Sequence, residues 1–129
     1  MANRGASRYP RTARVGELLR EIVAEELTRL DDSRLDMVAI TKVTVDRELE
    51  KAVVYFDTLA GPEDDAEVVG ALDEHRVRIQ AAVGRQARLR RTPHLVFRPD
   101  EVTRGAERID DILAQLGQDE PARPDEDPT

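Results

Sequence analysis

The chain has 129 residues, 40% hydrophobic and 36% charged, with a formal net charge of −7 and no cysteine, which predicts one domain with a modest core and excludes disulfides and thiolate chemistry. No run approaches the roughly 18 apolar residues of a membrane span, and the basic N-terminus leads into a glutamate-rich amphipathic stretch, so we expect no membrane anchor and no secretory signal. The cytoplasm is the expected location, and no cofactor is expected.

Residues 1–9 are predicted to form a flexible basic arm. Pro10 suits a helix start, because proline lacks the N–H that the first helical turn leaves unpaired. From there to Leu30, apolar residues recur at steps of three and four, which predicts one amphipathic helix ending at residue 30 or 31. Its four glutamates mostly face away from the apolar stripe.

Two β-branched runs follow this helix. Residues 37–46 alternate in their second half, which places Thr41, Val43 and Val45 on one face of a strand. Residues 51–57 form the second run. Because about four polar residues separate the runs, we predict an antiparallel hairpin.

The rest of the chain predicts a broken helix, a strand and a last helix. Helical spacing runs from residue 64 to about residue 87, which is long for so small a domain, so we expect a kink near residues 75–77. Pro93 excludes further helix, and residues 94–98 predict a third strand. Residues 103–116 predict the last helix, with Thr103 as its N-cap, and residues 117–129 predict an acidic disordered tail.

The predicted order of elements defines the fold class. Strands mixed with segregated helices in so short a chain are typical of an α+β two-layer sandwich. We therefore predict that residues 10–116 form one domain, with helices packed on one face of a three-stranded sheet.

Charge is unevenly distributed along the chain. Residues 117–129 hold five acids and one arginine, so the other 116 residues carry only −3 of the net charge of −7. Residues 1–16 hold four arginines and no acid, and residues 76–99 hold seven arginines and no acid. Two basic segments in an acidic chain indicate local binding surfaces for an anionic partner.

The sequence gives little support to catalysis or to a metal site. It lacks a GxxxxGK[ST] loop, and neither Ser7 nor Ser33 lies in a nucleophile-elbow motif. Of the two histidines, His94 lies within the acid-free residues 76–99 and His75 directly before them. We therefore expect neither an enzyme nor a small-molecule substrate.

The arginines are the candidate RNA-binding residues. A guanidinium group matches the geometry of phosphate oxygens, so a cluster of arginines is a candidate phosphate-binding site. A solvated helix face that pairs with nearby glutamates explains the same pattern equally well. The candidates are Arg76, Arg78, Arg85, Arg88, Arg90 and Arg91, with Arg11 and Arg14 as a second contact.

Aromatic residues limit the mode of binding. The chain has two tyrosines and two phenylalanines, and Tyr55 and Phe56 are strand neighbours that point to opposite faces. A base-stacking platform of the RNA-recognition-motif type is therefore not expected. Recognition of the RNA backbone and shape is the more natural mode.

Several motifs resemble those of the bacterial ribosome-binding factor A family over residues 11–116. The most specific are RLRRTPHLVF at residues 88–97 and GAERIDDIL at residues 105–113, in combination. ITKVTVDREL at residues 40–49, KAVVY at residues 51–55 and RV at residues 14–15 accompany them.

The resemblance implies a type II KH-like domain, α-β-β-α-kink-α-β, with a C-terminal helix. Family members are non-enzymatic factors that bind the free small (30S) ribosomal subunit and assist late 16S rRNA maturation, and some are linked to growth in the cold. The family has an Ala-x-Gly kink where ordinary KH domains have a phosphate-gripping GxxG loop. This chain departs from that pattern, with His75-Arg76-Val77 at the kink. We expect a monomer, whose acid-free segment approaches rRNA phosphates.

Two alternatives remain open from the residues themselves. In the first, the chain is a KH-like protein-interaction module whose arginines bind an acidic protein and touch no RNA. In the second, it is a small hydrolase-like or regulatory domain, which the missing nucleophile and phosphate loop argue against.

Overall fold

The structure is a computed structural model that describes residues 10–119, so the predicted arm at residues 1–9 and most of the predicted tail lie outside the described residues. Its elements follow the predicted order, with two short 3-10 turns in addition. They are α2 (Arg11–Thr28), η1 (Ser33–Leu35), β1 (Val38–Val45), β2 (Lys51–Thr58), η2 (Pro62–Asp64), α3 (Asp65–Glu74), α4 (Arg76–Ala87), β3 (His94–Pro99) and α5 (Glu101–Asp119).

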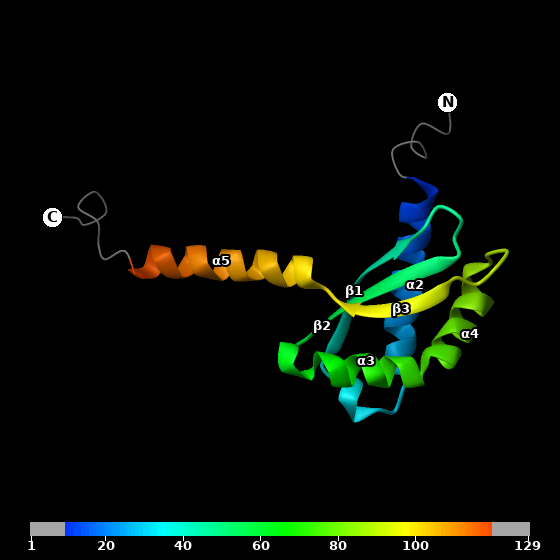
Figure 1. Cartoon of the computed structure of the whole chain (residues 1–129), viewed down its shortest axis with the longest axis horizontal. Coiled ribbons are helices and arrows are strands. Elements are labelled where there is room, and N and C mark those ends of the chain that lie inside the picture. Colours follow the sequence, from blue (N-terminus) through cyan, green and yellow to red (C-terminus); the bar gives the residue numbers. More distant parts are fainter. Residues whose placement is uncertain (1–9, 120–129) are drawn as a thin grey trace.

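The sheet has the strand order β1-β2-β3, with β1 and β2 antiparallel and β2 and β3 parallel (Figure 1). The predicted hairpin is thus confirmed, and α3 with α4 forms the crossover that a parallel pair requires. Along β2, Ala52, Val54 and Phe56 are fully buried, while the residues between them are half-exposed. Helices therefore cover one face of the sheet and leave the other open, which confirms the α+β two-layer sandwich.

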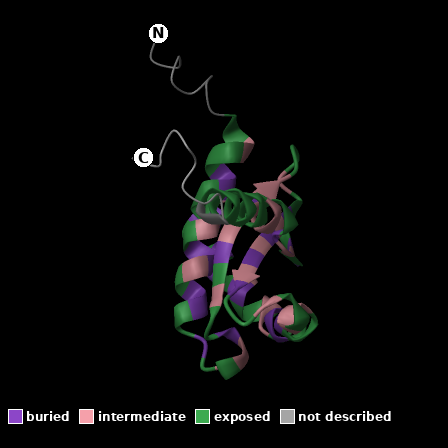
Figure 2. Ribbon diagram, turned by 90° about the vertical axis from the view of Figure 1, so that its left-hand side faces the viewer, coloured by how far each residue is buried: buried purple, intermediate pink, exposed green. Residues whose placement is uncertain are grey.

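The helix α2 lies against β1 along its apolar stripe. Leu19 and Val23 are fully buried, and Figure 2 shows buried segments along the length of this helix. At Gly16 the helix approaches so closely that an added Cβ would collide with the backbone oxygen of Val43. Glu26 departs from the prediction for the glutamates, since it is only 3% exposed.

One face assignment in β1 was wrong. The register against β2 shifts between Ile40 and Lys42, where a bulge adds one residue to β1. As a result Ile40 and Val43 both face the core, and Thr41 does not. The hydroxyl of Thr41 instead donates a hydrogen bond of 2.5 Å to the carboxylate of Asp100.

The predicted helix break is confirmed at His75, between α3 and α4. His75 has φ −98° and ψ 6°, a conformation open to any L-residue, so this break requires no glycine. Side chains at the 3-10 turn η1 stabilise the helix break by polar contacts. The Nε2 of His75 lies 2.9 Å from Asp32, and Arg34 bonds to both Asp32 and Glu74.

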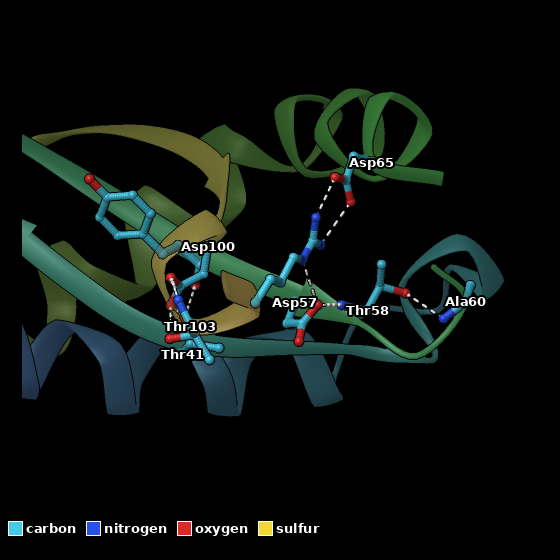
Figure 3. A network of polar contacts seen from close by, with 9 residues as sticks. Thr41, Asp57, Thr58, Ala60, Asp65, Asp100 and Thr103 are labelled. Atoms are coloured by element: carbon cyan, nitrogen blue, oxygen red, sulfur yellow. Dashed lines mark hydrogen bonds and ion pairs between the residues drawn. The ribbon is translucent and has the colours of Figure 1, made fainter. Parts of the chain in front are cut away.

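The last helix differs from the prediction in its start and its packing. α5 begins at Glu101, because Asp100 is the capping residue and accepts hydrogen bonds of 2.9 Å from the N–H and 2.8 Å from the hydroxyl of Thr103 (Figure 3). Thr103 as N-cap was therefore wrong. The helix runs three residues past the predicted end and projects from the sandwich instead of packing on the sheet (Figure 1). Its apolar residues, such as Ile109 and Leu113, are 58% and 60% exposed.

Candidate nucleic-acid interface

Arg78, one of the predicted RNA contacts, is 52% exposed but pairs with a buried acid of the fold. Its Nε donates a hydrogen bond of 2.9 Å to the buried carboxylate of Glu26, which joins α4 to α2. A buried carboxylate without a cation would carry a large desolvation cost. The structure thus gives Arg78 a stabilising role.

Arg76 is also turned toward the protein. Its guanidinium lies 5.9 Å from the centre of the Phe97 ring, within cation–π range, and pairs with Asp73 one turn earlier. These contacts fix Arg76 at the start of α4, beside the break at His75. Arg76 and Arg78 therefore each pair with an acid of the fold.

The four candidate arginines between residues 85 and 91 are exposed. Arg85 lies in the last turn of α4, and Arg88 ends the helix with a left-handed conformation of φ 56°. Arg90 and Arg91 follow in the link to β3. This link folds back along α4, because Gly84 leaves room where a Cβ would stand 2.9 Å from the hydroxyl oxygen of Thr92.

The fold brings the link and the start of α2 together. Arg11, Arg90 and Arg91 line one open hollow of about 270 Å³, with Leu49 and Leu89 beside them. The start of α2, the β1–β2 turn and the α4–β3 link lie at the same end of the molecule (Figure 1). We call the set Arg11, Arg85, Arg88, Arg90 and Arg91 the arginine end. Arg14 is exposed on α2 but does not line the hollow.

Two acids of the β1–β2 turn share this hollow, which the sequence did not predict. Glu48 and Glu50 line it, and Glu50 lies 3.6 Å from the guanidinium of Arg91. Asp46 holds the turn by accepting a hydrogen bond of 2.7 Å from the N–H of Glu50. Since both partners are well exposed, the pair between Glu50 and Arg91 is weak and leaves Arg91 able to exchange partners.

The described residues offer little for other chemistry. Within residues 10–119, no group of three His, Asp or Glu side chains is placed to hold a metal ion. None of the helices in that range is long and apolar enough to cross a membrane.

The order of elements and the three-stranded sheet define a KH-like domain. A family model described as Ribosome-binding factor A matches residues 11–113. The chain therefore belongs to the ribosome-binding factor A family, as its motifs indicated. The ribosome-binding factor A of Rubrobacter xylanophilus is 41% identical over 111 residues, which cover 84% of this chain and 90% of that one.

Solved structures agree with this assignment. The crystal structure of ribosome-binding factor A from Thermus thermophilus matches with a TM-score of 0.62 and 30% identity, over 68% of this chain and 94% of that chain. A homology model of the Thermus thermophilus factor, fitted into a cryo-EM map of its complex with the 30S subunit, matches with a TM-score of 0.55 and 30% identity, over 64% of this chain and 88% of that chain.

Proposed function

We propose that this protein binds the free small (30S) ribosomal subunit through its arginine end and assists late maturation of the 16S rRNA. The observation that carries the proposal is the convergence of Arg11, Arg90 and Arg91 on one hollow from segments about 80 residues apart. The Thermus thermophilus relative that forms a complex with the 30S subunit supports the choice of partner.

The arginine end suits rRNA phosphates in its chemistry. Guanidinium groups donate paired hydrogen bonds to phosphate oxygens, and Arg85, Arg88 and Arg90 are exposed for this purpose. Glu48 and Glu50 lie beside these arginines, so they would weaken the binding of any partner that cannot displace their carboxylates from the arginines. Binding therefore depends on several correctly placed phosphates, which disfavours casual contact with other RNA.

The protein would act without catalysing a bond change. A factor of this kind assists maturation by binding one conformation of the rRNA more tightly than another, which shifts the population toward the bound form. We propose that it does so in the cytoplasm as a monomer. A bacterium that lacks its own family member should then regain growth in the cold and lose accumulated 16S precursor when it expresses this chain.

A charge-reversal pair tests the interface directly. Arg90→Glu should weaken binding to purified 30S subunits roughly tenfold or more, because a charge-assisted contact becomes a repulsion. Arg108→Glu makes the same charge change on the exposed face of α5 and should bind like the unmodified protein. Equal binding by the two variants would remove the arginine end from the interface.

The competing function is a protein-interaction module whose arginines bind an acidic protein. The pair between Glu50 and Arg91 shows that a carboxylate can occupy this surface. Nuclease treatment distinguishes the two functions. Digestion of the rRNA should release the protein from its large partner in the proposed function and should leave it bound in the competing one.

A further inference from the structure

The open face of the sheet carries a row of three side chains across all three strands. Lys42 on β1 pairs with Tyr55 on β2, and Tyr55 pairs with Arg98 on β3. Residues directly opposite each other in a sheet point to the same face. The tyrosine ring therefore lies between two cationic side chains, on the face that no helix covers.

Positive charge continues along this face. Val53 and Val96 form the next row, and Lys51 pairs with His94 beyond them. The only two lysines of the chain, Lys42 and Lys51, thus both lie here. Neither these lysines nor Arg98 forms an ion pair with any of the residues 10–119.

The row borders a hollow. Lys42, Tyr55 and Arg98 line an open space of about 300 Å³, whose other wall is the start of α5, with Asp100, Glu101 and Val102. This volume lies at the lower end of the range for sites that hold small organic groups. Val102 is 84% exposed, so an occupant of the hollow would cover an apolar side chain opposite the tyrosine ring.

We propose that this hollow binds one unpaired RNA base, stacked on Tyr55, with Lys42 and Arg98 on the flanking phosphates. An aromatic ring between free cations matches a nucleotide, which has a π-face and a phosphate on either side. Glu101 disfavours a phosphate inside the hollow and accepts a hydrogen bond from a base amino group. An acidic protein segment could form ion pairs with Lys42 and Arg98, but it would leave the ring of Tyr55 without a stacking partner.

This site is separate from the arginine end and rests on the proposed function only for the class of its ligand. A single ring stacks a single base, so the site differs from a platform of two or three aromatics. It gives the protein a second RNA contact, on single-stranded rRNA. The two contacts can therefore be removed independently.

The test uses the full chain and a labelled hexanucleotide of single-stranded RNA, followed by fluorescence anisotropy. Tyr55→Leu keeps an apolar side chain and removes the stacking face, so the dissociation constant should rise about 5- to 100-fold. Tyr55→Phe keeps the ring and should bind like the unmodified protein. Inorganic polyphosphate, which has no bases, should bind the Tyr55→Leu variant and the unmodified protein equally.

The outcomes separate this inference from the proposed function. If Tyr55→Leu binds the hexanucleotide like the unmodified protein, or if only Arg90→Glu weakens binding, the stacking site is refuted, whatever happens at the 30S subunit. If Tyr55→Leu loses the hexanucleotide while Tyr55→Phe retains it, the site stands, even if the protein fails to bind 30S subunits. A thermal melt of each variant confirms that the fold is kept, and the Tyr55→Phe result remains decisive if Tyr55→Leu unfolds, since loss of binding there would refute stacking.

Discussion

Arg104 and Asp65 join the first turn of α5 to the first turn of α3. The guanidinium of Arg104 donates hydrogen bonds of 2.6 and 2.9 Å to the two carboxylate oxygens of Asp65, and its Nε donates a third, of 2.8 Å, to Asp57 on β2. Asp57 and Asp65 lie on either side of this guanidinium (Figure 3). The hydrogen bonds to Asp65 first, and to Asp57, raise the pKa of Arg104. The base of α5 is thus fixed by polar contacts while its apolar stripe stays exposed.

Arg104→Lys should loosen the base of α5. A lysine cannot donate the paired bonds that the guanidinium makes to two carboxylates, so the free energy of unfolding should fall by about 1–3 kcal/mol. Amide hydrogen exchange should rise in residues 101–108. Arg108→Lys, on the exposed side of the same helix, is the control and should change neither quantity.

Gly16→Ala should destabilise the domain although alanine favours a helix. The added Cβ would meet the backbone oxygen of Val43, which cannot move without shifting β1, and such overpacking typically costs about 1–3 kcal/mol. Gly70→Ala is the matched control, because nothing lies within 4 Å of a Cβ at that helical position. In the Gly70→Ala control, the free energy of unfolding should rise by up to about 1 kcal/mol. Urea unfolding measures the stability of both variants. If both variants were more stable than the unmodified protein, the close approach of α2 to β1 would be contradicted.

Arg78→Met should lower stability, and Arg85→Met should not. Without Arg78, the buried carboxylate of Glu26 loses its hydrogen bond of 2.9 Å and keeps only a long contact of 3.5 Å to Arg29. The free energy of unfolding should therefore fall by about 1–3 kcal/mol. Arg85 is exposed in the same helix, so its replacement should stay within about 0.5 kcal/mol. If the two variants unfold alike, Arg78 is not a structural residue.

Acid should weaken the contacts that stabilise the chain at the helix break, at His75. Hydrogen bonds from Arg34 first, and then from His75, hold the pKa of Asp32 well below its ordinary value. A carboxylate with a depressed pKa stabilises the fold above its unfolded pKa, which lies near 4, and loses this contribution as the pH falls toward its folded value. The free energy of unfolding should therefore fall between about pH 5 and pH 2. Asp32→Asn should be less stable at pH 7 and should show a shallower fall, and an unchanged acid slope would contradict this role.

The regular elements could be predicted because each one repeats a local pattern. The apolar stripe of α2, the β-branched run of β2 and the excessive length of residues 64–87 were sufficient to place α2, β2 and a helix broken near His75. The bulge at Thr41 could not be predicted, because the partner of its hydroxyl, Asp100, lies 59 residues away. The predicted start of α5 was wrong for the same reason, since Asp100 both caps that helix and accepts a hydrogen bond from Thr41.

The exposure of the candidate arginines could be predicted only in part. An acid-free run correctly indicated exposed arginines at residues 85–91, but charge alone could not separate them from Arg78. One signal was present, because Glu26 lies beside Leu27 on the inner side of α2 and a buried carboxylate requires a cation. The approach of Glu48 and Glu50 depends on the β1–β2 turn, which sequence spacing does not place in space.

Sedimentation through a sucrose gradient tests the central claim most directly. Tagged protein in a bacterial lysate should comigrate with the free 30S subunit at low salt and leave it at high salt. The slope of log affinity against log salt should be about −0.7 to −0.9 per phosphate contact. Protein that stays at the top of the gradient at low salt would contradict the account.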